Sequence, residues 1–148
     1  MTNEPRLKST ELYDEPLVVA FAADHPFVER DMVTLERIAQ EPYLDRLACE
    51  FRDTFIAESA ARGQTIRFVA RSEREDWIQR LVLAGAGVTT LPAESVVVDG
   101  LMTRPGDAPS VWRTVSLAVP YGREDTAPVR AFLAAAREFD WGAVVGRS

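Results

Sequence analysis

Short apolar runs and amphipathic segments alternate along this chain, which predicts an α/β protein. Residues 17–22 form a continuous apolar run, LVVAFA, typical of a buried strand. The run ends at the His25-Pro26 turn, because proline lacks the N–H group that a strand ladder needs. Residues 34–39 then predict a short helix, whose large apolar residues lie on one face.

The middle of the chain continues as strand, helix and strand. A second strand starts at Tyr43, and residues 51–62 predict a helix that Gly63 ends. The expected apolar stripe of this helix consists of Phe51, Phe55, Ile56 and Ala60. Residues 66–70 follow with the alternating pattern of a strand.

A third helix and strand complete this central unit. Ser72 and Glu75 have the S-x-x-E spacing of a capping box, whose side chains satisfy free N–H groups at a helix start. The helix behind it ends near Gly85, and its expected stripe consists of Trp77, Ile78, Leu81 and Val82. Residues 87–91 form the next strand. Because the loops are short, the strands of this β-α-β-α-β unit should be parallel, with right-handed crossovers.

The pattern changes after Pro92. Residues 101–103 and 113–119 predict two more strands, and a final helix opens at residues 126–128. The first strand and this last strand and helix therefore bracket the central unit. Such an order predicts a chain that leaves one lobe, builds a second and returns, with a ligand cleft between the lobes.

Composition places the chain among ordinary globular proteins. It has 148 residues, 47% of them hydrophobic, and 17 Lys and Arg against 23 Asp and Glu give a net charge of −6. A free-standing nucleic-acid binder usually has a basic face, so this acidity argues against that class. The sequence has neither a run of about 20 apolar residues nor a signal core, so we expect no membrane anchoring and no export. The single cysteine, Cys49, fits a reducing cytoplasm.

Several segments, in this order, resemble the effector-binding domain of LysR-type transcriptional regulators, which has the periplasmic-binding-protein-like fold. The most specific is LVLAGAGVTTLP at residues 81–92, which is similar to the family pattern V-x-A-G-x-G-[IV]-x-x-[LM]-P. The other matching segments are residues 15–21, the Asp24-His25-Pro26 turn, residues 34–39, 41–44, 100–104 and 113–119, and the terminal helix.

The resemblance implies a type II effector domain with a complete βαβαβ second lobe and a partial first lobe. Lobe two would span residues 24–111. Residues 12–23 and 112–141 would form the partial lobe one, with its crossover strands and last helix. Residues 1–11 would be a disordered terminus, and residues 142–148 a tail. A full regulator begins with a winged helix-turn-helix, for which no room is left. We therefore expect a truncated chain that does not bind DNA itself.

The turn before the predicted helix 51–62 is the main candidate for effector binding, because the resemblance places it at the cleft. Free N–H groups at a helix start favour anions, and Arg52 is able to grip a carboxylate. The predicted effector-binding residues are Cys49, Glu50, Phe51, Arg52, Ser72 and Trp112. In the alternative, the acidic residues only stabilise the helix start, the arginine is solvated, the serine is only a cap and the tryptophan packs in the interior.

Cys49 carries a separate redox hypothesis. A helix start and two nearby arginines would favour its thiolate form. The peroxide-sensing branch of the LysR-type regulators, the family that this sequence resembles, has its reactive cysteine in a similar turn. In this sequence the spacing from the cysteine to the following Arg-Asp differs by one residue. A second cysteine is lacking, so an intrachain disulfide is impossible. Two hypotheses stay open for Cys49: a sulfenate or mixed-disulfide sensor, or a small cysteine that is buried or lines the cleft.

The sequence lacks the residues that other kinds of functional site require. His25 is the single histidine and lies in a turn, so the sequence predicts no zinc site and no Ser-His-Asp triad. Gly85 and Gly87 close a helix rather than open one, which argues against phosphate-binding and dinucleotide-binding motifs. We therefore predict no catalysis, no metal and no cofactor.

The preferred hypothesis is a ligand-sensing module of a LysR-type regulator that binds a small organic acid or another small anion. Effector binding would change lobe closure and so the oligomer that positions the DNA-binding parts. In the alternative hypothesis, exposed sheet edges pair with another copy or with a full-length regulator. The chain would then modulate mixed oligomers without an effector of its own.

Overall fold

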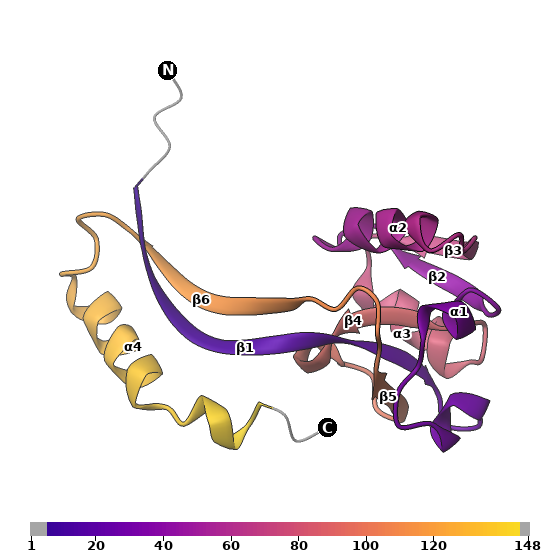
Figure 1. Ribbon diagram of the computed structural model, residues 1–148. Coiled ribbons are helices and arrows are strands. Elements are labelled where there is room, and N and C mark those ends of the chain that lie inside the picture. The colour runs from indigo at the N-terminus through magenta and orange to yellow at the C-terminus, as the bar shows by residue number, and fades with distance from the viewer. Residues whose placement is uncertain (1–5, 146–148) are drawn as a thin grey trace. The chain divides into compact units, whose positions relative to one another are not determined.

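The computed structural model describes residues 6–145, which divide into two compact units (Figure 1). Among the described residues, unit 1 contains 6–15 and 113–145, and unit 2 contains 16–112. The elements in chain order are β1 (Leu7–Ala22), η1 (Pro26–Glu29), α1 (Leu35–Ile38), β2 (Pro42–Arg46), α2 (Arg52–Ala61), β3 (Arg67–Ser72), α3 (Glu75–Leu83), β4 (Thr89–Pro92), η2 (Ala93–Ser95), β5 (Leu101–Pro105), β6 (Trp112–Pro120), α4 (Ala127–Glu138) and η3 (Trp141–Ala143). None of the helices in the described part is long and apolar enough to cross a membrane.

Unit 2 contains the predicted β-α-β-α-β order. β2 and β3 pair in parallel, and α2 connects them. A parallel bridge between Tyr43 and Val88 joins β2 to the segment that enters β4. The second half of β1 lies between β4 and β5 and is antiparallel to both. The sequence placed residues 12–23 with the first lobe, whereas the structure pairs residues 17–22 within unit 2.

Two helices cover opposite faces of the parallel strands (Figure 1). Neighbouring residues of a strand point to opposite faces, so Tyr43 and Leu44 of β2 lie on different sides. Tyr43 packs against Phe55 of α2, whereas Leu44 belongs to a buried cluster with Ile78 and Val82 of α3. All five side chains are buried. Burial of each apolar side chain contributes about 1.5–3 kcal/mol before entropy is counted, so these contacts fix both helices to the sheet.

Both helical stripes differ in part from the sequence prediction. In α2, Ser59 rather than Ala60 is buried, because its hydroxyl donates to a carbonyl of its own helix at 2.7 Å. In α3, Gln79 is buried, because its amide exchanges hydrogen bonds with the backbone of the segment after β4. Trp77 and Leu81 are exposed instead. Gln79 is polar, but its hydrogen bonds are satisfied, so it is buried on α3, whereas Trp77, which the apolar pattern predicted to be buried, is exposed.

The predicted capping box does not form. α3 begins at Glu75, and Arg74 takes the N-cap position without a side-chain cap. The Ser72 hydroxyl oxygen accepts a hydrogen bond from the backbone N–H of Arg74 at 2.9 Å. Ser72 therefore shapes the turn ahead of the helix, and the carboxylate of Glu75 pairs with Arg46.

Unit 1 consists of the first half of β1 together with β6 and α4. The predicted disordered terminus, residues 1–11, is wrong from Leu7 onward, because β1 starts there. Residues 1–5 of that prediction lie outside the described residues. This half of β1 is polar. Pairing with β6, rather than burial of apolar side chains, stabilises it as a strand. An ion pair between Arg113 and Glu15, at 2.6 Å, joins the two strands.

The C-terminal segment of unit 1 contacts β1. Trp141 stacks on Tyr13 with ring centres 5.6 Å apart, and its indole N–H donates to the Ala136 carbonyl at 2.8 Å. The predicted tail begins directly after Trp141, and its first two residues, 142 and 143, belong to η3. Its last residues, 146–148, lie outside the described residues.

Candidate functional site

The carboxyl ends of β2 and β3 bring several predicted site residues together. In open α/β sheets, ligands bind outside this edge of the strands. β2 ends with Asp45 and Arg46, and the following turn leads through Cys49 to Arg52 at the start of α2. β3 ends with Ser72, which is the register partner of Arg46. We take this edge of unit 2 as the candidate site.

An ion pair between Arg52 and Asp45 fixes the start of α2. The guanidinium donates to both carboxylate oxygens, with Nε–Oδ1 at 2.8 Å and Nη2–Oδ2 at 2.7 Å. The Asp45 side chain is 2% exposed and that of Arg52 is 27% exposed. The hydrogen bond to Asp45 raises the pKa of Arg52, so this side chain stays charged. Arg52 thus makes the bidentate grip that the sequence predicted, but on a carboxylate of its own chain.

Arg46 is also committed to partners within unit 2. Its Nε donates to Glu75 at 2.6 Å, and its Nη1 donates to the Thr90 carbonyl at 3.1 Å. The Arg46 side chain is only 10% exposed. These bonds tie the end of β2 to α3 and β4. Because each arginine faces a carboxylate, the edge of the sheet has little excess positive charge of its own.

Aromatic side chains form one wall of the site. Tyr43 stacks on Phe55 with ring centres 5.0 Å apart, and Phe68 meets Tyr43 edge-on at 5.7 Å. The Tyr43 hydroxyl lies 2.7 Å from the Thr90 hydroxyl, and burial raises the pKa of Tyr43, so the phenol stays neutral. The Arg52 guanidinium lies 6.0 Å from the centre of the Phe68 ring. These contacts hold the start of α2 rigidly against the sheet.

A hollow of about 10 Å³ opens among these side chains. It brings together three of the predicted residues, Cys49, Phe51 and Arg52. The other residues that line it are Tyr43, Asp45, Arg46, Phe55, Ile56, Phe68 and Thr90. This volume is close to that of a single water molecule. The hollow therefore has room for about one small group and does not enclose a molecule of the size of an organic effector.

The other three predicted residues do not line this hollow. Glu50 is exposed in the turn ahead of α2, and Ser72 is half-buried with its hydroxyl bound to a backbone N–H. Trp112 is 65% exposed and lines a different hollow, of about 330 Å³, whose walls are largely proline and aliphatic side chains. Their role in effector binding stays a prediction.

Sequence reasoning missed the residues that hold the site together. Asp45 is a charged residue directly after two buried positions, and a buried carboxylate requires a partner, so a signal was present. The contact between Tyr43 and Thr90 had no local signal, because the two residues are 47 positions apart. Phe68 was recognised as a strand residue, but its place beside α2 follows from the parallel pairing of β2 and β3.

His25 has a structural role in this fold. Its Nδ1 accepts a hydrogen bond from the Phe27 N–H at 3.1 Å, and its Nε2 lies 3.4 Å from a carboxylate oxygen of Glu41. It therefore caps the short helix η1. Within residues 6–145, no group of three or more His, Cys, Asp or Glu side chains is placed to hold a metal ion.

Known protein sequences are similar to this chain over most of its length. The profile described as the LysR substrate binding domain matches residues 2–141. A hydrogen peroxide-inducible genes activator of Pectobacterium carotovorum subsp. carotovorum is 31% identical over 112 residues, which are 72% of this chain and 37% of that protein. The chain thus spans little more than a third of the length of this relative.

Solved structures share the fold. The effector binding domain of QuiR, in complex with shikimate, has a TM-score of 0.68 and 21% identity, covering 92% of this chain and 66% of that one. The regulatory domain of Synechocystis PCC6803 CcmR, in complex with 2-PG, has a TM-score of 0.73 and 18% identity, covering 92% and 68%. At these identities the likeness concerns the fold alone. It confirms the predicted α/β, periplasmic-binding-protein-like fold class.

Proposed function

The chain belongs to the LysR substrate binding domain family, and from this premise we propose that it senses a small organic effector for a transcriptional regulator. The observation that carries the proposal is the meeting of Cys49, Phe51 and Arg52 at the carboxyl edge of the sheet. Two domains of similar fold contain a small molecule, shikimate in one and 2-PG in the other. In this proposal the chain binds its ligand without catalysing a reaction.

The ligand class that we propose is a small organic acid. Arg46 and Arg52 are already paired, so the attraction for a carboxylate comes from the first turn of α2. The N–H groups of Asp53 and Thr54 belong to this turn and have no partner within the helix. Phe51 precedes them and is half-buried, which gives the apolar part of such a ligand a surface to rest on.

The signal would pass to DNA through other parts of a regulator. A ligand shifts the balance between two conformations only by the difference in its affinity for them. We propose that the bound acid favours a closed arrangement of the domain. This changes the oligomer that the chain forms with a second copy or with a full-length regulator, in the cytoplasm where transcription takes place.

A thermal-shift screen of small organic acids should identify an effector. We expect a true ligand to raise Tm by about 5–10 °C at a hundredfold excess over Kd. Replacing Phe51 with alanine should weaken its binding about tenfold, because a buried aromatic contact of about 1.5 kcal/mol is lost. Phe132→Ala is the matched control, because Phe132 lies in unit 1 and is 64% exposed. A broad panel without a ligand, or equal losses in both variants, would count against the proposal.

A second candidate function is peroxide sensing by Cys49. The favouring observation is its place in the hollow beside Arg46 and Arg52, in a chain 31% identical to a hydrogen peroxide-inducible genes activator. In the reaction, the thiolate sulfur attacks one peroxide oxygen, the O–O bond breaks, and the second oxygen leaves as water after taking up a proton. The product is a sulfenic acid, with sulfur oxidised and peroxide reduced.

Mild hydrogen peroxide should then add one oxygen atom to Cys49. Peptide mapping by mass spectrometry locates the oxygen and separates it from oxidation of the three methionines, which serve as an internal reference. Cys49→Ser should lose this modification and keep the methionine products. Methionine oxidation ahead of any change at Cys49 would remove peroxide sensing from consideration.

A further inference from the structure

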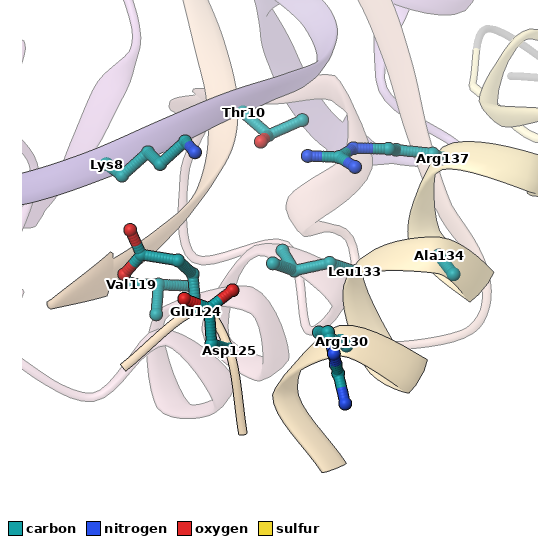
Figure 2. Close-up of a pocket in the computed structure, with 9 residues that line it drawn as sticks. All are labelled: Lys8, Thr10, Val119, Glu124, Asp125, Arg130, Leu133, Ala134 and Arg137. Atoms are coloured by element: carbon teal, nitrogen blue, oxygen red, sulfur yellow. The ribbon is translucent and has the colours of Figure 1, made fainter. Parts of the chain in front are cut away.

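A cavity of about 340 Å³ lies in unit 1, whereas the candidate effector site belongs to unit 2 (Figure 2). Its walls come from the start of β1, the end of β6, the loop that follows β6, and α4. The residues that line it are Lys8, Thr10, Val119, Glu124, Asp125, Arg130, Leu133, Ala134 and Arg137. Its size is at the lower end of the range for small-molecule pockets, about 300–1,000 Å³.

Side-chain periodicity explains why these residues share one cavity. Arg130, Leu133 and Arg137 are spaced i, i+3 and i+7 along α4, so they lie along one face of the helix. Lys8 and Thr10 are two positions apart in β1 and point to one face of that strand. Figure 2 shows Lys8 and Arg137 extending toward each other from opposite walls, with Thr10 between their ends.

The cations of this cavity are not neutralised by ion pairs. Within residues 6–145, the side chains of Lys8, Arg130 and Arg137 make no hydrogen bond or ion pair, whereas that of Arg113 in the same unit is paired with Glu15. All three cations are exposed and can be reached from solvent. Like charges that converge on one cavity repel each other, and a bound anion relieves this repulsion.

Two carboxylates also line the cavity, at the loop after β6. One oxygen of Glu124 accepts a hydrogen bond from the backbone N–H of Gly122 at 2.6 Å. Backbone hydrogen bonds, with a smaller contribution from the charge of Lys8, lower the pKa of Glu124. Its carboxylate is thus partly satisfied by its own loop, and Asp125 beside it is exposed. Three cations against two carboxylates leave an excess positive charge in a chain whose net charge is −6.

We propose that this cavity is a second ligand site, which binds a small organic carboxylate. The carboxylate group lies between Lys8 and Arg137, where the guanidinium offers two parallel donors. Thr10 supplies a hydroxyl to the same group. The apolar part of the ligand rests on Leu133 and Ala134, the aliphatic side chains of the cavity wall on α4. A purely inorganic anion would leave this apolar wall uncovered.

Titration of the full chain with hexanoate, followed by NMR or calorimetry, tests the proposal. We expect saturable binding with shifts in β1 and α4, and weaker binding of acetate, which lacks the chain that covers the apolar wall. Hexanamide, which has the same shape without the charge, should bind at least about tenfold more weakly, because hydrogen bonds to a charged group are lost. Arg137→Gln and Lys8→Gln should each weaken hexanoate binding by a similar factor.

Arg80→Gln is the matched control, because Arg80 is an exposed arginine of α3 in unit 2. It should leave hexanoate binding unchanged. Absence of hexanoate binding, equal binding of hexanamide, or full binding by Arg137→Gln and Lys8→Gln overturns the proposal. Binding of inorganic phosphate in place of hexanoate overturns the assignment to organic carboxylates. The Phe51→Ala variant should bind hexanoate normally, so this result is independent of the effector site in unit 2.

Discussion

Replacing Gly87 with alanine should lower the free energy of unfolding by about 3 kcal/mol, near the upper end of the cost of overpacking. A Cβ on Gly87 would lie 2.4 Å from the carbonyl oxygen of Pro42 and 2.9 Å from its carbonyl carbon. Because both atoms belong to the backbone of β2, the strand itself must move. The same stretch contains two hydrogen bonds of 2.9 Å, from Val88 N–H to the Pro42 carbonyl and from Leu44 N–H to the Val88 carbonyl. Displacement of β2 weakens both.

Urea denaturation followed by circular dichroism measures this loss, and Gly142→Ala provides a matched control. A Cβ on Gly142 would meet its nearest atom at an ordinary 3.5 Å. This variant should therefore stay within about 0.5 kcal/mol of the unsubstituted chain. If both alanine variants proved equally stable, the close approach of the segment at Gly87 to β2 would not limit the fold.

Gly87 also illustrates what the sequence predicted and what it left open. Gly85, two residues earlier, has φ of 79°, a conformation that favours glycine, and α3 ends at Leu83, so the predicted end of the helix near Gly85 is confirmed. The need for glycine at position 87 has a different cause, the carbonyl of Pro42. Pro42 lies in a strand far earlier in the sequence, and no local pattern brings the two together.

β1 shows the same division between local and distant causes. Its second half was predicted, because residues 17–22 are apolar and buried, and burial selects the strand directly. Its first half begins at Leu7 and is polar, so no hydrophobic period marks it as a strand. Pairing with β6 supplies its backbone partners, and the Tyr121 N–H donates to the Arg6 carbonyl at 2.7 Å. This pairing joins opposite ends of the sequence and is not visible in either segment alone.

At the candidate site, three of the four residues predicted from the turn before α2 were brought together. Cys49, Phe51 and Arg52 lie at one helix start, and the structure places all three around one hollow. Trp112 was included on its position at the returning crossover, and it lines a different hollow. The partner of Arg52 escaped prediction, because whether Asp45 is buried depends on the packing of β2 within unit 2.

Replacing Arg52 with methionine should therefore destabilise the protein by about 3 kcal/mol, the lower end of the cost of breaking a buried ion pair. The lower end applies because the Arg52 side chain is 27% exposed, although that of Asp45 is only 2% exposed. Methionine keeps an unbranched side chain at this position but leaves the Asp45 carboxylate without its two strong donors. Arg71 does not replace them, because its Nε is 4.0 Å from the carboxylate and its side chain is 60% exposed.

A double variant separates the loss of the charge pair from the loss of packing. Adding Asp45→Asn to Arg52→Met should recover most of the stability, because a neutral amide is far less costly to bury than an unpaired carboxylate. Arg71→Met, the control on the exposed arginine, should change the free energy of unfolding by less than about 0.5 kcal/mol. The same urea titrations give all three values. Recovery in the double variant would assign Arg52 to the support of its own site, leaving the first turn of α2 as the group that meets an anionic ligand. An Arg52→Met chain as stable as the unsubstituted one would instead leave the guanidinium available to the effector.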